Sequence, residues 1–452
     1  MSTVSKPTDL TAGPIAPALI RLALPLLFGN ILQQLYNTVD AVIVGRWAGS
    51  DAFAAVGVAG TLMNLFLFLL GGVCAGVAVI FSQQYGARDF AGFRRELFLS
   101  CTFGGLFSLA LSLLALLLAA PLLALIQTPA ELVPLCLDYL RVIFGGLLAC
   151  FAYNLSSSSL RSAGDTLAAL LALGVSILAN VGLDLLFVAK FQWGVAGAAW
   201  ATVASQTLAA ILAAGYLAWR YPELLFRRAD CVLDRGLLGR TVRFAAASAL
   251  HHCNLYLGKM LVQGAVNTLG TPGINAYTAA SRIEGFANSF GDSGAAALSV
   301  FVGQNTGAGR PDRVRKGYFD AVKLLAGLGV GMAVLMFVGA EFFSKLLLPA
   351  GAQWELSFSY SVDYLRTISL FYILCFTGNS FAGYFQGVGR LNIPVLGATS
   401  HITMRVILSW LLAQRLGLRA VALATGLGWI WVNCFWSLVF RGKILKQAAP
   451  GT

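Results

Sequence analysis

Carboxylates and neutral oxygen-bearing side chains recur inside stretches of the chain that are otherwise apolar. Asp40 follows Gln33 and Asn37 at helical spacing, so the three side chains share one face of a helix. Asn180 and Asp184 are four residues apart and share a face of another helix. An ionisable group at bilayer depth costs at least about 2.5–3.5 kcal/mol. Each acid therefore needs a partner or a role.

The same half of the chain offers further oxygen donors, namely Thr202 and Gln206, again four residues apart, and Tyr139 and Asn154. Two carboxylates in one desolvated pocket cannot easily both stay ionised, so one is protonated or a cation binds. Hard cations prefer oxygen ligands of these types. The residues predict a proton or Na⁺ site. The alternative is that Asp40 and Asp184 merely reach the outer membrane interface.

The second half carries bases as well as acids in apolar stretches. A polar stripe at helical spacing comprises His252, Tyr256, Lys259 and Gln263; later segments carry Arg282, Glu284, Asn288 and Asp292, then His401 and Arg405. Glu284 could pair with Lys259 or Arg405 and neutralise the charge. Alternatively, the two bases line a cavity and attract anionic groups of a substrate. His251 and His252 have no partner at metal-ligand spacing, so no metal site is predicted there.

The elements that position these residues are membrane-spanning helices. The chain is 58% hydrophobic and 11% charged, with a mean hydropathy of +0.77, whereas a soluble domain is about a quarter charged. Stretches of about 20 apolar residues can cross the bilayer. Twelve such stretches occur, at roughly 14–42, 52–82, 97–126, 134–158, 166–189, 195–218, 240–268, 274–302, 317–348, 360–386, 392–413 and 419–440. The fold class is therefore predicted to be an all-α integral membrane protein with twelve transmembrane helices.

A short sequence motif, which we call the repeated phrase, occurs twice, about half a chain apart. Residues 82–87 (SQQYGA) return as 303–308 (GQNTGA), and residues 160–165 (LRSAGD) are echoed by 385–390 (FQGVGR). Such a repeat predicts two equivalent membrane bundles. We expect an N-lobe at 1–218, a polar and charge-rich cytoplasmic linker at 219–239, and a C-lobe at 240–452. Under the repeat, Arg405 falls where Asn180 sits, and Lys259 falls near the position of Asp40.

The basic residues indicate the orientation of the chain. Arg and Lys cluster in alternate loops and in the tail that holds Arg441, Lys443 and Lys446. Positive loops stay in the cytoplasm, so an even number of spans places both termini there, in the cytoplasmic (inner) membrane. Topology and the anionic inner leaflet account for the net charge of +12, and nucleic acid is not needed as a partner.

Several classes of protein are disfavoured by what the sequence lacks. The polar first residues do not resemble a cleaved signal, so the first span is expected to be retained. The eight cysteines show no C-x-x-C pairing, so no disulfide or metal site is indicated. No nucleotide-binding or hydrolase motif occurs, so we expect neither an enzyme nor a cofactor. Energy would come from an ion gradient, worth about 2.3 kcal/mol per charge per 100 mV.

The segment PLLFGNILQQLYNTVD, from Pro25 to Asp40, the paired repeat phrases and the pair Asn180 and Asp184 resemble the multidrug and toxic compound extrusion (MATE) transporters. The resemblance covers essentially the whole chain. It implies two six-helix bundles related by a pseudo-twofold axis along the membrane normal, a central cavity and cation-driven antiport. It also implies a cation or proton site at the four positions Asp40, Asn180, Asp184 and Thr202, with Tyr139 and Asn154 nearby, and a bend of the first helix at Pro25.

One feature of the family's NorM-like branch is missing. That branch has an acidic cation site on the seventh and tenth helices, and neither 240–268 nor 367–386 contains an acid. The chain is therefore closer to the DinF-like branch. Pro25 itself either bends the first helix when the acid is protonated or forms a static kink.

The expected function is secondary antiport that exports amphiphilic organic compounds, driven by H⁺ or Na⁺, from a monomer embedded in the lipid bilayer. The alternative within the same superfamily is a flippase for lipid-linked precursors or anionic lipids. A membrane-embedded enzyme that acts on lipid would need a cluster of catalytic residues at the interface, and none is evident.

Overall fold

The computed structural model describes residues 9–348 and 353–448, with side chains up to Arg441. Within these ranges all the regular secondary structure is helical. The predicted basic tail residues Lys443 and Lys446 have no described side chains.

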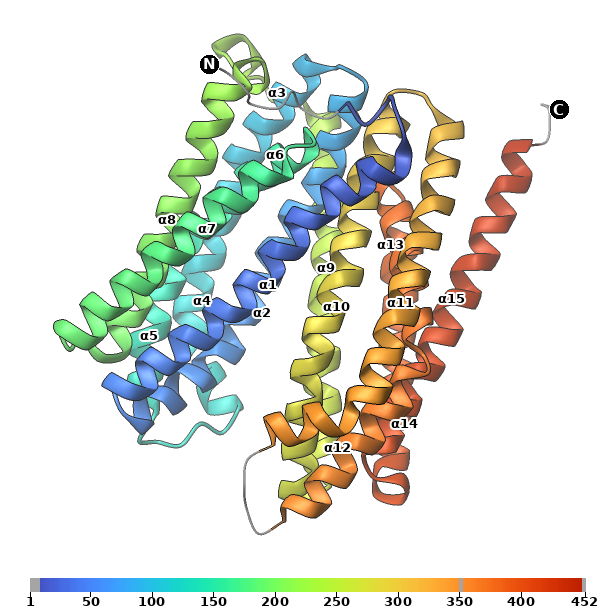
Figure 1. The fold of residues 1–452 in the computed structure, drawn as a ribbon. Coiled ribbons are helices and arrows are strands. Elements are labelled where there is room, and N and C mark those ends of the chain that lie inside the picture. The colour runs from blue at the N-terminus through green and yellow to red at the C-terminus, as the bar shows by residue number, and fades with distance from the viewer. Residues whose placement is uncertain (1–8, 349–352, 449–452) are drawn as a thin grey trace. The chain divides into compact units, whose positions relative to one another are not determined.

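The first half of the chain forms eight α-helices and two short π-helical segments (Figure 1). They are α1 (Ile15–Trp47), α2 (Ser50–Gly86), α3 (Phe90–Leu99), η1 (Ser100–Gly104), α4 (Gly105–Leu125), α5 (Val133–Gly145), α6 (Leu147–Ser162), α7 (Thr166–Asp184), η2 (Leu185–Lys190) and α8 (Gly194–Arg220). Helix α1 is continuous through Pro25.

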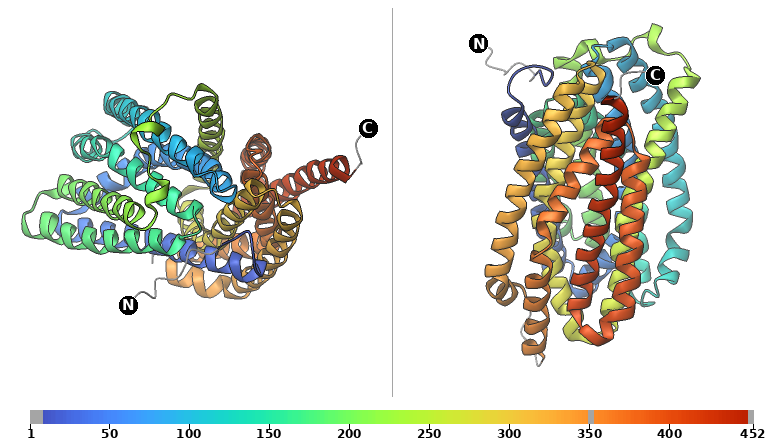
Figure 2. Two further views of the ribbon diagram at one scale, coloured as in Figure 1. Left: turned by 90° about the horizontal axis from the view of Figure 1, so that it is seen from above. Right: turned by 90° about the vertical axis from the view of Figure 1, so that its right-hand side faces the viewer.

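The second half begins with two 3₁₀ turns, which lie inside the predicted linker. The elements are η3 (Pro222–Leu224), η4 (Arg228–Asp230), α9 (Arg235–Asn267), α10 (Gly270–Gly307), α11 (Pro311–Leu347), α12 (Trp354–Ser369), α13 (Tyr372–Gly387), α14 (Asn392–Leu416) and α15 (Leu418–Ala448). In Figures 1 and 2, α14 runs beside α15, against which it packs.

Each of the twelve predicted spans corresponds to one helix or to one broken pair. Eight spans are long and apolar enough to cross a membrane, and two more are bent pairs, α5 with α6 at 45° and α12 with α13 at 53°. The remaining two, α9 and α10, have 33 and 38 residues and carry the charged residues Lys259, Glu284 and Asp292. The twelve-helix prediction is confirmed. Most of the predicted spans are shorter than the observed helices, because the helices continue into polar residues beyond the apolar stretch.

Two of these boundary errors occur where a helix begins among charged residues. The third predicted span starts at 97, but α3 begins at Phe90 and so includes Glu96. The seventh starts at 240 in the prediction, but α9 begins at Arg235, inside the expected linker. In both cases charged residues in the first turns conceal a helix that has already begun.

The described chain divides into two compact units. Unit 1 contains the described residues 9–13, 24–252 and 303–310, and unit 2 contains 14–23, 253–302 and the described chain from 311 on. Three helices contribute to both units: α1 divides after Ala23, α9 after His252 and α10 after Val302. The first division falls two residues before Pro25.

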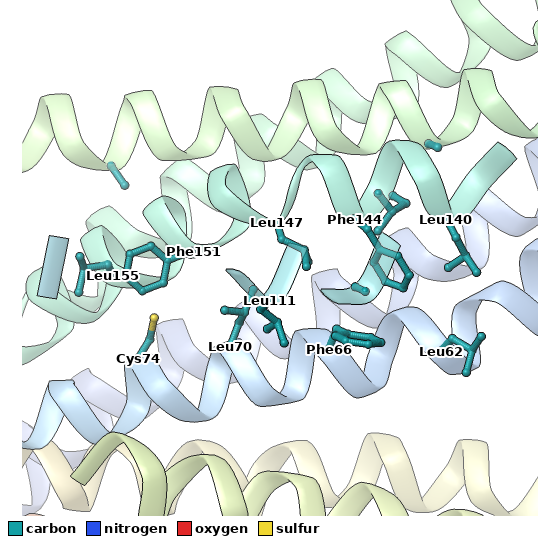
Figure 3. Packing of buried hydrophobic residues seen from close by; sticks show 14 of the residues in the cluster. Leu62, Phe66, Leu70, Cys74, Leu111, Leu140, Phe144, Leu147, Phe151 and Leu155 are labelled. Atoms are coloured by element: carbon teal, nitrogen blue, oxygen red, sulfur yellow. The ribbon is translucent and has the colours of Figure 1, made fainter. Parts of the chain in front are cut away.

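The core of unit 1 forms between α2 and the broken pair of α5 and α6 (Figure 3). Residues four apart on α2, namely Leu62, Phe66, Leu70 and Cys74, face this pair. The rings of Phe66 and Phe144 meet edge to face, with centroids 4.9 Å apart. At the bend between α5 and α6, the hydroxyl of Ser112 donates to the carbonyl oxygen of Phe144. The polar backbone exposed by the break is thus satisfied inside the protein.

The core of unit 2 is built from α9 to α15 and is rich in aromatic side chains. Tyr364, Tyr372 and Phe376 on the bent pair of α12 and α13 are completely buried. Tyr372 lies edge to face with Trp429 of α15, with ring centroids 5.6 Å apart.

Glycines allow helices of unit 1 to approach closely. Gly72 and Gly76 lie one turn apart on α2 and face the backbone of α9 at Ala249 and Phe244. Small residues at this spacing permit backbone contact between membrane helices. We call the contact between α9 up to His252 and helices α2 and α3 the α9 seam.

The repeated phrase meets its own copy in unit 1. A Cβ atom at Gly86 would collide with the backbone of Gln304, and a Cβ at Gly307 would collide with the backbone of Gln83. The two glycines are equivalent positions of the repeat, and so are the two glutamines. The phrase is therefore a reciprocal helix crossing, and its glycines are required by space.

The predicted linker is anchored to α3 by a salt bridge. Arg94 Nε lies 2.8 Å from Asp230 Oδ2, and Arg94 also donates to the carbonyl oxygen of Glu223 at 3.3 Å. The hydrogen bond from Arg94 lowers the pKa of Asp230 below its ordinary value of 3.8. Ionised Asp230 also accepts from the backbone N–H of Arg227 at 3.0 Å, which holds the η4 turn in place.

The first prediction concerns the α9 seam. A Cβ at Gly72 would lie 2.6 Å from the Cα of Ala249, whereas a Cβ at Gly71 would meet nothing within 4 Å. We expect Gly72→Ala to lower the free energy of unfolding by about 1–3 kcal/mol, the usual cost of overpacking. Thermal unfolding in detergent measures this. Gly71→Ala is the matched control and should be neutral or stabilising; equal melting temperatures for the two variants would contradict the close approach.

The second prediction concerns the linker. Because the pKa of Asp230 is lowered, its anchoring is complete above pH 3.8 and is lost as the pH falls through the lowered value. Asp230→Asn should remove the anchor at neutral pH and make tryptic cleavage after Arg227 and Arg228 several-fold faster. Glu223→Gln, an exposed acid in the same segment, is the control. Unchanged cleavage in Asp230→Asn would show that the salt bridge does not hold the linker.

Candidate functional site

The structure brings Asp40 and Asp184 together inside unit 1. Asp40 on α1 is 8% exposed, and Asp184 at the end of α7 is completely buried. The two carboxyl groups are close enough to interact electrostatically. Asn180, one turn before Asp184 on α7, is also buried. The face that Asn180 and Asp184 are predicted to share therefore corresponds to a buried polar surface, and both acids are buried within unit 1.

A change in helix geometry follows the second acid. The π-helical segment η2 begins at Leu185, directly after Asp184. Such segments insert an extra residue per turn, redirect the neighbouring side chains and are frequent at functional sites. The local backbone thus marks Asp184 independently of its charge.

Several polar atoms of this cluster are buried without a hydrogen-bond partner in the described part of the protein. They are Asp40 Oδ1, both side-chain polar atoms of Asn180, both carboxyl oxygens of Asp184, and Gln206 Oε1. Leaving one such group unsatisfied costs about 1–3 kcal/mol, and more for a charged group. None of the ion pairs in the described residues involves either acid. Within the described residues, the cluster therefore has an excess of oxygen acceptors and no ion-paired base.

Two tyrosines extend the cluster. The hydroxyl groups of Tyr36 on α1 and Thr202 on α8 lie 3.2 Å apart, and Tyr139 of α5 donates to Met63 Sδ at 3.8 Å. Both tyrosine hydroxyls feel the field of Asp40. Tyr36 was missed in the sequence, although it lies one turn before Asp40 and its position alone could have identified it.

Three predicted supporting residues lie differently. Asn37 is exposed, and Gln33 is partly buried. Asn154 donates to the carbonyl oxygen of Cys150 in its own helix at 2.9 Å. The structure gives no contact between these three residues and the carboxyl pair, and their supporting role stays a prediction.

Chemically, this arrangement can hold a proton or a small hard cation. Carboxylate, amide and hydroxyl oxygens are the ligands that such cations prefer. Asp40, Asn180, Asp184 and Thr202 would supply those ligands for Na⁺. For H⁺, the two facing carboxyl groups are sufficient, since protonating one removes the repulsion between them.

A second polar cluster lies within unit 2. Buried Glu284 on α10 accepts a hydrogen bond from Tyr364 at 2.9 Å, and Arg405 on α14 donates to the hydroxyl of Tyr277 at 3.3 Å. The rings of Tyr277 and Tyr364 stand at 89° with centroids 5.7 Å apart. Two tyrosines thus stand between the acid and the base, and no ion pair within 4.0 Å joins Glu284 to Arg405 in the described chain.

The other predicted unit 2 residues are more open. Lys259 is exposed and lies within electrostatic range of Glu284 and Asp292. Gln263 donates to Asn267 in its own helix at 2.9 Å, and Tyr256 is partly buried. Among the described residues, Glu284 forms no ion pair within 4.0 Å with Lys259 or Arg405, although both bases lie within its electrostatic range.

Comparison with known proteins gives consistent matches along the chain. A family model described as MatE matches residues 25–186 and 247–411. The chain is 25% identical over 440 residues to the probable multidrug resistance protein YpnP of Bacillus subtilis (strain 168), covering 96% of this chain and 97% of that protein. It is also 25% identical over 209 residues to the multidrug export protein MepA of Staphylococcus aureus (strain MRSA252), covering 44% of each chain.

Solved structures share the fold. One is described as the outward-facing conformation of a multidrug resistance MATE family transporter, with a TM-score of 0.91, 23% identity, and coverage of 99% of this chain and 100% of that chain. Another is a MOP superfamily transporter from Pyrococcus furiosus, whose description reports a reversed polarity of its binding pocket. It has a TM-score of 0.90, 23% identity, and coverage of 99% of this chain and 100% of that chain.

Proposed function

This chain is a member of the MatE family of multi-pass membrane transporters, and we propose that it exports amphiphilic organic compounds by antiport with H⁺ or Na⁺. The substrate class follows from its relatives, which are described as multidrug resistance and export proteins. These relatives do not favour the alternative of a lipid flippase. The coupling ion and the individual substrate belong to the proposal.

The observation that carries the proposal is the pair of facing, buried carboxyl groups without a basic partner. Asp40 and Asp184 have buried oxygens that nothing in the described protein satisfies. A positive charge that enters this cluster is stabilised both by the acids and by the relief of their repulsion. The cluster is thus suited to a cation that binds and leaves during each cycle.

The gradient supplies enough free energy for such export. One charge that moves down 100 mV releases about 2.3 kcal/mol, which corresponds to roughly fifty-fold accumulation of an uncharged substrate. In the proposed cycle, H⁺ or Na⁺ binds at the Asp40 and Asp184 cluster from outside and is released to the cytoplasm. Substrate is carried outward in the conformational change that precedes binding of the ion from outside.

Helix α1 would change its shape when a proton or cation occupies the site. Asp40 and Tyr36 lie on it, and Pro25 removes one backbone hydrogen bond and lowers the stiffness of the helix. The change of unit within α1 occurs next to this proline. We propose that binding at Asp40 changes the bend at Pro25 and alters the space available to substrate.

The second cluster, which lies within unit 2, would supply further polar contacts for a substrate. Lys259 is exposed on α9, which also carries Tyr256 and Gln263. Arg405 and Glu284, linked through Tyr277 and Tyr364, add one charge of each sign. Because α9 and α13 contain no acid, we assign the protein to the DinF-like branch and place the coupling ion in the N-lobe alone.

The proposal also includes the arrangement in the cell. The alternation of basic loops supports two lobes, at 1–218 and 240–452, joined by a cytoplasmic linker. The same alternation supports a location in the inner membrane with both termini in the cytoplasm. We expect the functional unit to be a monomer.

The third prediction tests the coupling site. Asp40→Asn keeps the size of the side chain but removes its charge and its proton, so gradient-driven export in everted vesicles should fall to background while expression persists. The imposed gradient should be varied between Na⁺ and pH. Asp138→Asn is the control, because Asp138 is an exposed acid of the same unit in a surface ion pair with Arg141. Wild-type export by Asp40→Asn would refute the assignment.

A further inference from the structure

Glu96 is a buried carboxyl group that the proposed mechanism does not use. It lies on α3 with 0% of its surface exposed. Ser100 Oγ lies 3.1 Å from its Oε1, and Thr241 Oγ1 on α9 lies 3.0 and 2.9 Å from Oε1 and Oε2. Hydroxyl groups from two different helices thus enclose the acid, and its place is in the α9 seam.

The contacts of the Thr241 hydroxyl indicate the protonation state of Glu96. Thr241 Oγ1 also lies 2.8 Å from the carbonyl oxygen of Leu237. A hydroxyl group has one proton to donate and two lone pairs that accept. If that proton goes to Leu237, Glu96 must itself be protonated and donate to Thr241. The neutral acid can donate to Thr241 through one carboxyl oxygen and accept from Ser100 through the other, whereas an ionised carboxylate would be buried with at most these two hydroxyl donors and no ion pair in the described chain.

No base in contact neutralises Glu96. Arg240 on α9 is the cation that acts on it electrostatically, and the guanidinium of Arg240 donates to Gln83 Oε1 of α2. No ion pair in the described chain includes Glu96. The charge of Arg240 therefore acts at a distance, while its hydrogen bond holds α9 to the repeated phrase.

The other charged groups packed around α3 are directed elsewhere. Arg94 of α3 is bound to Asp230 and to the carbonyl oxygen of Glu223 in the linker turns, and Arg95 is exposed. Helix α2 contains one charged residue, Asp51, at its opposite end, and η1 contains none.

On α9, Arg235 and Arg243 are exposed. His251 and His252 lie ten and eleven residues after Thr241, at the far end of the seam. Glu96 is therefore the carboxyl group at the contact of Thr241 with α3.

The repeat shows that the scaffold does not require an acid here. Glu96 lies ten residues after Gly86, and Gly317 lies ten residues after the equivalent Gly307. At Gly317 the ring of Phe301 occupies the space of a side chain. A π-helical segment, η1, begins four residues after Glu96, and η2 begins one residue after Asp184. The acid is therefore particular to the first copy, and the backbone after it departs from a regular α-helix.

We propose that Glu96 is a second protonation site, whose proton locks the first half of α9 against α2 and α3. The inference rests on the proposed alternation between two conformations, with the seam at the cytoplasmic end. When α9 withdraws, Glu96 meets cytoplasmic water and loses its proton, and the seam closes again only when the proton returns. The closed seam binds the proton more tightly, so its stabilisation is present at low cytoplasmic pH and is lost as the pH rises.

The fourth prediction is tested by hydrogen exchange of the backbone amides of residues 240–252 in lipid nanodiscs, without substrate or gradient. Between about pH 6 and about pH 9, opening of the wild-type seam should rise by up to about tenfold per pH unit, the limit for one titrating group. The Glu96→Gln variant has no titratable group at this position, so its amide exchange shows only the intrinsic pH dependence of the exchange reaction. The ratio of wild type to Glu96→Gln should therefore increase with pH.

The controls separate titration from a general loss of packing. Glu223→Gln, an exposed acid near the seam, should retain the wild-type pH dependence. Thr241→Val keeps the shape of the side chain but removes the oxygen that accepts the proton, so opening should be raised already at low pH. An identical pH profile in wild type and Glu96→Gln, or unaltered exchange in Thr241→Val, would overturn the proposal. Because the assay needs no transport, its outcome is independent of that of the antiport experiment.

Discussion

The cost of placing ionisable groups in hydrocarbon governs the functional regions of this protein. Helices satisfy the backbone, so the remaining cost falls on a few polar side chains. At Asp40 and Asp184 this cost is only partly met, because the described residues supply no ion-paired base and leave carboxyl oxygens unsatisfied. In unit 2, two tyrosines share the cost between Glu284 and Arg405. The incompletely compensated cluster is the one suited to exchange a cation.

A repeated scaffold carries chemistry that is not repeated. The two copies of the glycine phrase cross each other at Gly86 and Gly307, so symmetry is used for close packing. The acids depart from that symmetry: Asp184 has no acidic counterpart in the second copy, and Gly317 stands opposite Glu96. Packing constraints apply to both copies, whereas the proposed antiport needs only one coupling site. Duplicated architecture and the single proposed ion site are therefore compatible.

The sequence predicts what local physical rules determine. Twelve spans follow from apolar length, and the face shared by Asn180 and Asp184 follows from helical spacing. Glu96 escaped because its helix begins among charged residues, before the apolar stretch. The link from Glu284 to Arg405 through Tyr364 and Tyr277 escaped because its members come from helices far apart in the chain. Their choice of partner depends on packing that no spacing rule contains.

The central claim is that the Asp40 and Asp184 pair holds an exchangeable proton or cation. Infrared difference spectroscopy of purified Glu96→Gln protein tests it most directly, because that background removes the second proposed protonation site. We predict a protonated-carboxyl band that disappears when the pH is raised or Na⁺ is added, and that is absent after the further change Asp184→Asn. The same band, with the same response, in the protein that carries Asp184→Asn would contradict the account.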